Sequence, residues 1–152
     1  MATIKLHVQT YSSLTITGAT LPTLASAAYA NSSIIDHSTN DPFDVLVEVT
    51  ANTTGTVSGN KQLLVFAKGS IDGTNFGSGP ESGATSTDEP DLHYVGSLPM
   101  NTNNMNHKKI FSLATAYGGT LPMKSKIIFK NDLGTALTSG TANIAEVWGV
   151  SA

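Results

Sequence analysis

The chain has 152 residues, of which 39% are hydrophobic and 12% charged, with a formal net charge of −3. It contains no arginine and no cysteine, which excludes bidentate guanidinium grips on phosphate and all thiolate chemistry. The basic residues are all lysines scattered along the chain, so no concentrated basic face is expected and nucleic acid is not predicted as a partner. This length predicts a single domain, residues 1–152.

The first residues, Met1 to Leu6, lack a charged segment followed by a long apolar stretch, so no secretory signal is expected. No window approaches the roughly 18 apolar residues of a membrane-spanning helix, and no membrane partner is predicted. The sequence therefore favours a protein that is made in a cytoplasm and stays soluble. Because it has no cysteine, its fold does not depend on a disulfide and is equally suited to conditions outside the cell.

Most hydrophobic runs alternate apolar with polar residues, which favours strands over helices. In chain order, strands are expected at residues 4–8, 14–16, 33–35, 43–49, 62–68, 92–95, 109–113, 127–129 and 144–150. Within 62–68, the continuous run Leu63 to Phe66 predicts a strand covered on both faces. Residues 112–117 and the Ala-rich segment 23–29 are each expected to form one helical turn.

Glycine, asparagine and aspartate separate these runs, for example at Asp72-Gly73 and Gly118-Gly119. Short strands with turns at fairly regular spacing predict an all-β fold. The expected architecture is an antiparallel two-sheet sandwich, jelly-roll-like, with less than about a tenth of the residues in helix.

Two segments interrupt the strand pattern. Residues 76–90 are rich in Gly, Ser and Thr and predict a flexible loop with little to bury, and residues 99–106 form an Asn-rich connection. Long loops at the ends of a sandwich often form contact surfaces. The candidate interaction residues are therefore Phe76, Asp88, Asp91, Asn101, Asn104 and Tyr117.

No catalytic, cofactor or metal site is predicted. The four histidines, His7, His37, His93 and His107, are far apart in the sequence, and surface or turn roles are favoured over a zinc site. No Gly-x-Ser-x-Gly elbow marks a hydrolase. Asp88, Glu89 and Asp91, with Asp72, are alternatives as calcium ligands, but structural loop roles are favoured. A carboxylate pair for glycoside hydrolysis is also left open, although the sequence selects no pair.

Aromatic residues offer one further alternative. In a carbohydrate-binding sandwich, Trp148, Tyr94 and Tyr117 would stack on sugar rings if they lay exposed on one concave face. The favoured interpretation is that Trp148 packs in the core or against a neighbouring subunit, because large aromatic residues dominate both environments.

The second half of the chain combines a strand, an Asp-Gly turn, another strand and a final Asn-x-x-Gly turn, in the segments Gly69–Phe76, Phe111–Pro122 and Lys126–Leu137. In these segments it resembles small virion proteins of tailed bacteriophages. The resemblance implies a jelly-roll protein that decorates the capsid as a cement protein, or a minor tail component. The motifs are structural, and the resemblance assigns no functional residue.

The sequence therefore predicts a structural virion protein, not an enzyme, that binds the lattice of the major capsid protein. It is expected to form a homo-oligomer, with a trimer preferred to a dimer, because symmetric additives bind at symmetric points of a shell. The alternatives are a tail- or fibre-associated phage protein and a carbohydrate-binding module with surface glycans as partner. A glycan hydrolase comes after these.

Overall fold

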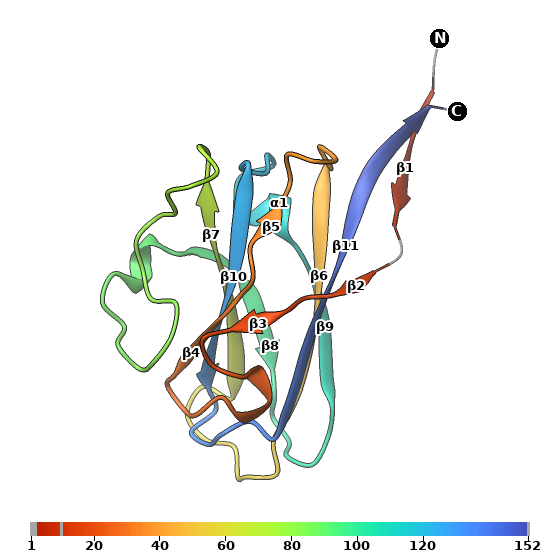
Figure 1. Cartoon of the computed structure of the whole chain (residues 1–152). Coiled ribbons are helices and arrows are strands. Elements are labelled where there is room, and N and C mark those ends of the chain that lie inside the picture. The colour runs from red at the N-terminus through yellow and green to blue at the C-terminus, as the bar shows by residue number, and fades with distance from the viewer. Residues whose placement is uncertain (1–2, 10, 152) are drawn as a thin grey trace.

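The computed structural model describes residues 3–9 and 11–151; Met1, Ala2, Thr10 and Ala152 lie outside the described residues. The chain is nearly all β, with 46% strand and 7% helix, and its two antiparallel sheets pack face to face as a sandwich (Figure 1). The predicted two-sheet antiparallel sandwich is thus confirmed.

One sheet, sheet A, has the strand order β1-β11-β6-β9, with β2 also pairing with β11. The other, sheet B, has the order β3-β4-β10-β7-β8, with β5 also pairing with β10. The strands of sheet A are β1 (Ile4–Val8), β2 (Ser12–Ser13), β6 (Asp44–Asn52), β9 (His107–Ser112) and β11 (Ser139–Ser151). Those of sheet B are β3 (Ile16–Thr17), β4 (Tyr29–Ser32), β5 (Ile35–Asp36), β7 (Gln62–Ser70), β8 (His93–Pro99) and β10 (Lys124–Asp132).

The longer strands pair in a nested order. When the two-residue strands β2, β3 and β5 are set aside, eight remain. The first of them pairs with the eighth, the second with the seventh, the third with the sixth and the fourth with the fifth. This is the pairing of a long antiparallel hairpin folded over on itself. Each half of the chain therefore contributes to both sheets.

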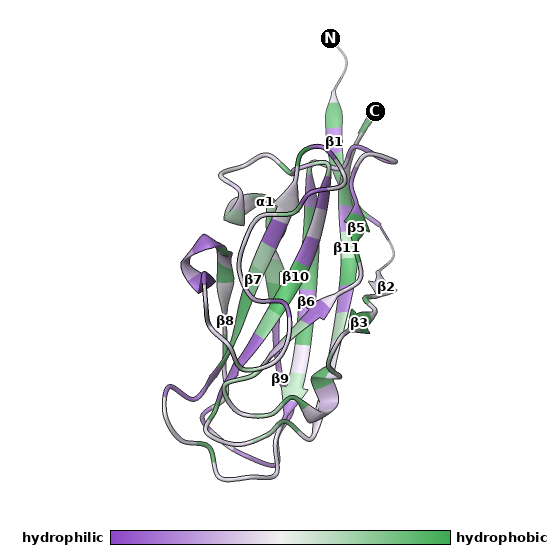
Figure 2. Ribbon diagram, turned by 60° about the vertical axis from the view of Figure 1, so that its left-hand side comes forward, coloured by the Kyte–Doolittle hydropathy of each residue, from purple (hydrophilic) through white to green (hydrophobic). Residues whose placement is uncertain are grey.

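The core lies between the sheets and follows from the alternation in β6. Val45, Val47, Val49 and Ala51 are fully buried, while the residues between them are partly exposed on the other face. Phe129 of β10 and the inward apolar residues of β7 belong to the same hydrophobic cluster. Figure 2 shows that apolar residues are frequent along the strands of the sandwich. At Gly96 of β8 the ring of Phe111 comes so close that an added Cβ would lie 2.7 Å from it, so glycine is required there.

Several sequence expectations need correction at the level of individual elements. The segment 23–29 is not a helical turn: the turn η1 (Leu21–Thr23) precedes it and β4 begins at Tyr29. The turn expected at 112–117 is confirmed as α1 (Leu113–Ala116), where the Ser112 side chain accepts a hydrogen bond from the Thr115 N–H at 3.2 Å. The described residues form eleven strands, more than the eight or nine expected, because short edge strands give almost no periodic signal.

A two-stranded ribbon projects from one end of the sandwich. Strand β11 pairs with β6 only from Ser139 to Val147, whereas its last residues pair with β1 alone. The ribbon is here defined as Ile4–Val8 together with Val147–Ser151 (Figure 1). Every residue of β1 is exposed. None of the helical turns in the described part of the chain is long or apolar enough to cross a membrane.

The burial of Phe129 generates the first prediction. We expect Phe129→Ala to lower the free energy of unfolding by about 3–5 kcal/mol, since it removes a fully buried ring between the sheets. Ile71→Ala is the control, because Ile71 is 87% exposed and its truncation should cost less than about 1 kcal/mol. Urea unfolding monitored by circular dichroism measures both. Equal losses would contradict this placement of the core.

Candidate functional site

The segment from residue 71 to residue 92 lies against the outer face of sheet B (Figure 1). It covers a second, smaller hydrophobic cluster made of Tyr29, Phe66, Leu92 and Ile128. The Tyr29 N–H donates to the Gly83 carbonyl within the segment. None of residues 76–90 is itself buried, but the segment covers buried apolar side chains of sheet B, a role that its composition did not indicate. This cover also explains the apolar run of β7, since Phe66 is covered from outside while Val65 faces the core.

Three lysines of sheet B hold this segment through ion pairs. Lys68, which is only 6% exposed, lies 3.0 Å from Glu81 and donates to the Gly79 carbonyl at 2.9 Å. Lys126 reaches the other oxygen of Glu81 at 2.9 Å. The second acid, Glu89, is 2.6 Å from Lys130 and accepts a hydrogen bond from the Tyr29 hydroxyl. Because Lys68 is buried, loss of its partner would leave an uncompensated charge.

The pKa of Glu81 reflects these contacts. Burial of the carboxyl opposes its ionisation, but the hydrogen bonds and charges of Lys126 and Lys68 outweigh burial and hold the pKa below the ordinary value of 4.5. Glu81 is therefore an anion that joins two strands to the covering segment.

The six candidate interaction residues do not form one surface. Phe76 is partly buried, with the Lys126 ammonium 4.8 Å from its ring centroid. Asp88 and Asp91 are exposed at the helical turn η2 (Glu89–Asp91) of the covering segment. Tyr117 is half-buried, with its ring centroid 4.7 Å from that of His93. Only Asn101 and Asn104 lie exposed together, in the loop between β8 and β9.

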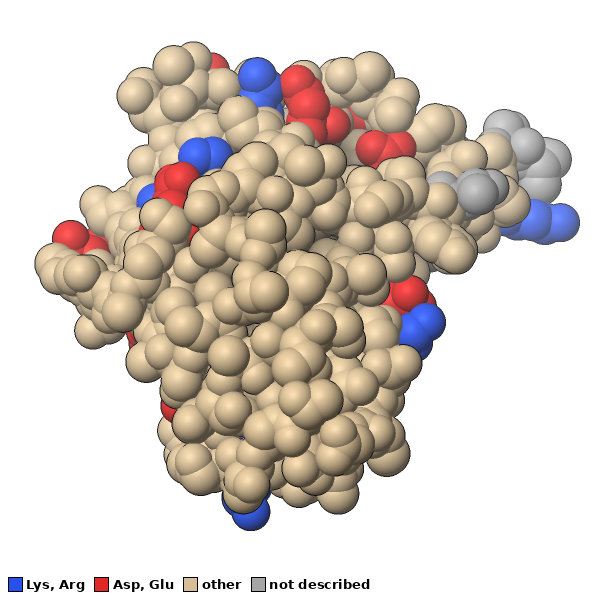
Figure 3. Space-filling view, turned by 60° about the horizontal axis from the view of Figure 1, so that its bottom comes forward, with Lys and Arg blue, Asp and Glu red and all other residues tan. Residues whose placement is uncertain are grey.

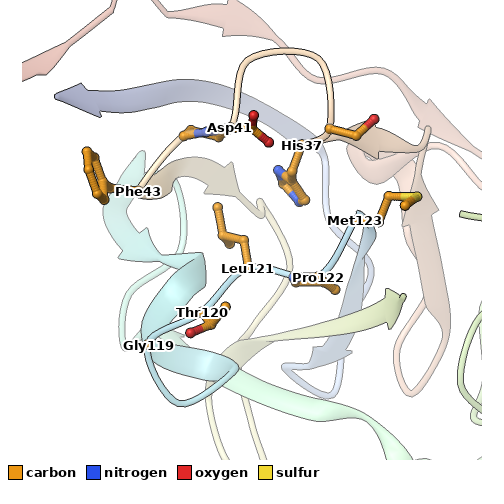
Figure 4. A pocket seen from close by; sticks show the side chains of 10 residues that line it. His37, Asp41, Phe43, Gly119, Thr120, Leu121, Pro122 and Met123 are labelled. Carbon is orange, nitrogen blue, oxygen red and sulfur yellow. The ribbon is translucent and has the colours of Figure 1, made fainter. Parts of the chain in front are cut away.

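A cleft of about 390 Å³ opens between the loops 37–43 and 119–123 (Figure 4). His37 in its wall is 4% exposed, and its Nε2 lies 3.0 Å from the Ser125 hydroxyl. Burial lowers the pKa of His37 although the carboxylates of Glu146 and Asp36 oppose this, and burial raises the pKa of Tyr117 to about 12. Ser125 is fully buried, so this Ser–His pair packs the cleft wall and presents no nucleophile at the surface.

The three aromatic residues considered for sugar binding lie in separate places. Tyr94 is 56% exposed and packs edge-to-face on Phe66, on the outer side of sheet B. Trp148 lies at the base of the ribbon, where its Nε1 donates to Glu146 at 2.9 Å. Tyr117 follows α1 and contacts His93. No shared stacking platform is formed by these three side chains.

Acidic residues and histidines do not gather into a metal site either. Within residues 3–9 and 11–151, no group of three or more His, Asp or Glu side chains is placed to hold an ion. The Asp72 carboxylate closes its own turn by accepting from the N–H groups of Asn75 and Thr74, and these hydrogen bonds lower its pKa. The oxygens of the Asp72 carboxylate are therefore already used in hydrogen bonds within the turn.

The end of the sandwich opposite the ribbon is almost free of charge. Three loops, 53–60, 100–106 and 133–138, meet there, and none contains a lysine, aspartate or glutamate. We call these loops the neutral end. Figure 3 shows a broad face on which charged side chains lie mainly at the margins. Asn101 and Asn104 belong to it, so these two candidates lie on a continuous neutral polar surface.

Buried polar groups fix the loops of the neutral end. Asn131, fully buried, donates to the carbonyls of Leu24 at 2.7 Å and Thr135 at 2.8 Å, and accepts from the Leu133 N–H at 3.0 Å. The Asn104 N–H donates to the Thr53 carbonyl, which ties loop 100–106 to loop 53–60. Sequence reasoning identified Asn131 only as a turn residue. The surface is thus held in place from beneath, and its shape is defined before any partner binds.

Comparison with known proteins adds no family assignment: no family model matches the chain, and no curated protein matches it. The function is therefore inferred from the geometry of the molecule.

The ion pairs of the covering segment generate the second prediction. We expect Glu81→Gln to lower the free energy of unfolding by about 1–3 kcal/mol at pH 7, because it leaves the buried Lys68 ammonium without its counter-charge. Since the folded-state pKa of Glu81 is depressed, its contribution is complete above the ordinary value of 4.5 and is lost as the pH falls through the folded value. The variant should therefore lose less stability on acidification than the parent chain.

Glu48→Gln is the matched control. Glu48 pairs with the exposed Lys108 at 3.2 Å on the surface of sheet A, and such pairs contribute less than about 1 kcal/mol. Urea titrations at several pH values between neutral and strongly acidic compare the three proteins. If the two variants behave alike, the covering segment is not held by Glu81.

Proposed function

We propose that this chain is a structural virion protein that decorates a phage capsid and stabilises it by binding the lattice of the major capsid protein. The observation that carries the proposal is the neutral end, a broad surface without charged side chains in its loops. It belongs to a protein with no reactive centre among the side chains weighed above. We infer that the neutral end is the face that meets the capsid.

A neutral polar surface suits attachment to a repeating lattice. Charged side chains must lose their hydration when a surface is covered, and this is costly unless each one is paired. Amide and hydroxyl groups, such as those of Asn101, Asn103 and Thr102, need only hydrogen bonds to stay satisfied. A protein bound only to the assembled shell then stabilises the shell by mass action.

Fold and composition support the same proposal. The nested pairing of the eight longer strands is what a jelly roll would have, which agrees with the resemblance to small virion proteins. Without cysteine, the sandwich keeps the same covalent structure in the host cytoplasm and on a released particle. A tail- or fibre-associated role remains the alternative within the virion. Surface glycans are the less supported partner, because Trp148, Tyr94 and Tyr117 share no platform.

The third prediction tests the capsid-facing surface. We expect Asn101→Glu to weaken co-sedimentation with empty capsids of the source phage at least about 10-fold, because the new carboxylate would be covered without a partner. Ser86→Glu is the control: it adds the same charge at an exposed position of the covering segment and should leave binding unchanged. Binding of the parent chain should also change little with salt, since no charge pair is required.

Other outcomes separate the alternatives. Co-sedimentation with purified tails but not with capsids would replace the capsid assignment by the tail assignment. Equal effects of Asn101→Glu and Ser86→Glu would show that attachment uses another surface.

A further inference from the structure

The ribbon leaves an apolar face without cover on its own chain. Ile4, Leu6 and Val8 lie on one side of β1 and are 66%, 70% and 52% exposed. Two further exposed aromatic residues, Phe43 and Tyr11, extend this patch. Phe43 and Ile4 lie over Gly149, the partner of Leu6 in the middle of the ribbon, where an added Cβ would be 2.6 Å from the Phe43 ring. At the inner end, Val8 and the exposed Tyr11 line one shallow apolar groove.

This patch is large for a monomer of this size. Five apolar side chains, each at least half exposed, present on the order of 600 Å² of surface, the upper end of what monomers usually carry. A standard interface buries about 800 Å² on each partner, so the patch is close to the size that a stable dimer needs. A two-stranded ribbon is also only marginally stable in water, whereas additional strands with a hydrophobic face stabilise it.

The free backbone groups of the ribbon belong to the same three residues. The Gln9 N–H donates to the Glu146 carbonyl at 2.9 Å, so Val8, one residue earlier, pairs with Val147 without direct hydrogen bonds. Because the pattern alternates, the N–H and C=O groups of Ile4, Leu6 and Val8 point away from β11. Strand β1 is an edge of sheet A, so these groups face outward, ready to pair with another strand.

We propose that the partner strand is β1 of a second copy of this chain, paired antiparallel about a two-fold axis at Leu6. In this register Ile4 of one copy lies opposite Val8 of the other, and the two Leu6 residues face each other. The segment Ile4-Lys5-Leu6-His7-Val8 has the same apolar and polar pattern read in either direction, which is what a two-fold contact requires. The two ribbons would then form one four-stranded sheet with a continuous apolar face.

The positions of Lys5 and His7 favour the proposed register over one that is shifted by one residue. Both lie on the opposite face of β1, beside Val150 and Trp148 of β11. In the proposed register, Lys5 of one copy lies next to His7 of the other, where a neutral imidazole accepts a hydrogen bond from the ammonium. A register centred on Lys5 would instead place two ammonium groups opposite each other, which is unfavourable. The proposal goes beyond the proposed function, and it replaces the trimer that the sequence analysis expected with a dimer.

The fourth prediction concerns the mass of the isolated protein in solution, which analytical ultracentrifugation measures. The parent chain should have twice the 15.8 kDa mass of one copy. Leu6→Lys should raise the dissociation constant at least about 100-fold, since it places two ammonium groups at the axis. Ile71→Lys is the control, because Ile71 is 87% exposed outside the patch and its replacement should leave the dimer intact. A monomer at all concentrations, or a trimer, would overturn the proposal.

Cysteine cross-linking tests the register, and the chain offers a clean background because it has no cysteine. In the proposed dimer, residues 5 and 7 of different copies are directly opposite and within reach of a disulfide, whereas residues 5 and 5 are not. Mixed Lys5→Cys and His7→Cys proteins should therefore form cross-linked dimers on mild oxidation, and either variant alone should not. Cross-linking of one variant alone, or none in the mixture, would overturn the register.

These tests are independent of capsid binding. Because β1 is exposed throughout, Leu6→Lys should have the same circular dichroism spectrum as the parent chain. If Leu6→Lys fails to fold, the cross-linking experiment still tests the dimer, because it does not use this variant. A monomeric chain that still co-sediments with capsids would remove the dimer and keep the proposed function. A dimeric chain that binds no capsid would keep the dimer and remove the proposed function.

Discussion

The packing of β6 against β10 and β7 is the interaction on which the rest of the molecule depends. Val45, Val47 and Val49 of β6 fill the space between the sheets together with Ile127 and Phe129 of β10, and all are fully buried. This contact fixes the relative position of the two sheets, and therefore where every loop at either end begins. The neutral end, the cleft beside His37 and the ribbon are all placed by strands that extend from this centre.

Sheet B carries a second layer that makes the molecule thicker on one side. The segment over Tyr29, Phe66 and Ile128 shields apolar residues that would otherwise face water, and Lys68, Lys126 and Lys130 tie it down through two glutamates. These pairs take up three of the eight lysines of the chain. The charges of these three lysines are therefore paired within the molecule and do not form a basic patch on the outer face of sheet B.

The two ends of the sandwich have different physical characters, which suits them to different contacts. The neutral end is polar and supported from beneath by Asn131, which is the character that the proposed contact with a capsid lattice requires. The ribbon end is apolar and has an open strand edge, so it fits another strand of the same kind. A dimer joined through its ribbons would carry two neutral ends. Binding two lattice sites at once raises the overall affinity well above that of a single contact, provided that both sites are reached.

The sequence by itself determined the fold class, because alternation in β1, β6 and β11 and the turn residues between runs are local signals that burial in a sandwich preserves. It also indicated that the run Leu63 to Phe66 is covered on both faces.

It did not reveal that residues 76–90 are the cover, since the partners of Glu81 and Glu89 lie on strands far away in the chain and polar loop residues look alike whether free or paired. For the same reason, it gave no basis for placing Asn101 and Asn104 together and apart from the other four candidates. The pattern of β1 is identical for a strand that faces a core and one that faces water. Only the tertiary structure shows that β11 extends past the end of β6, so that Ile4, Leu6 and Val8 pair with it outside the sandwich.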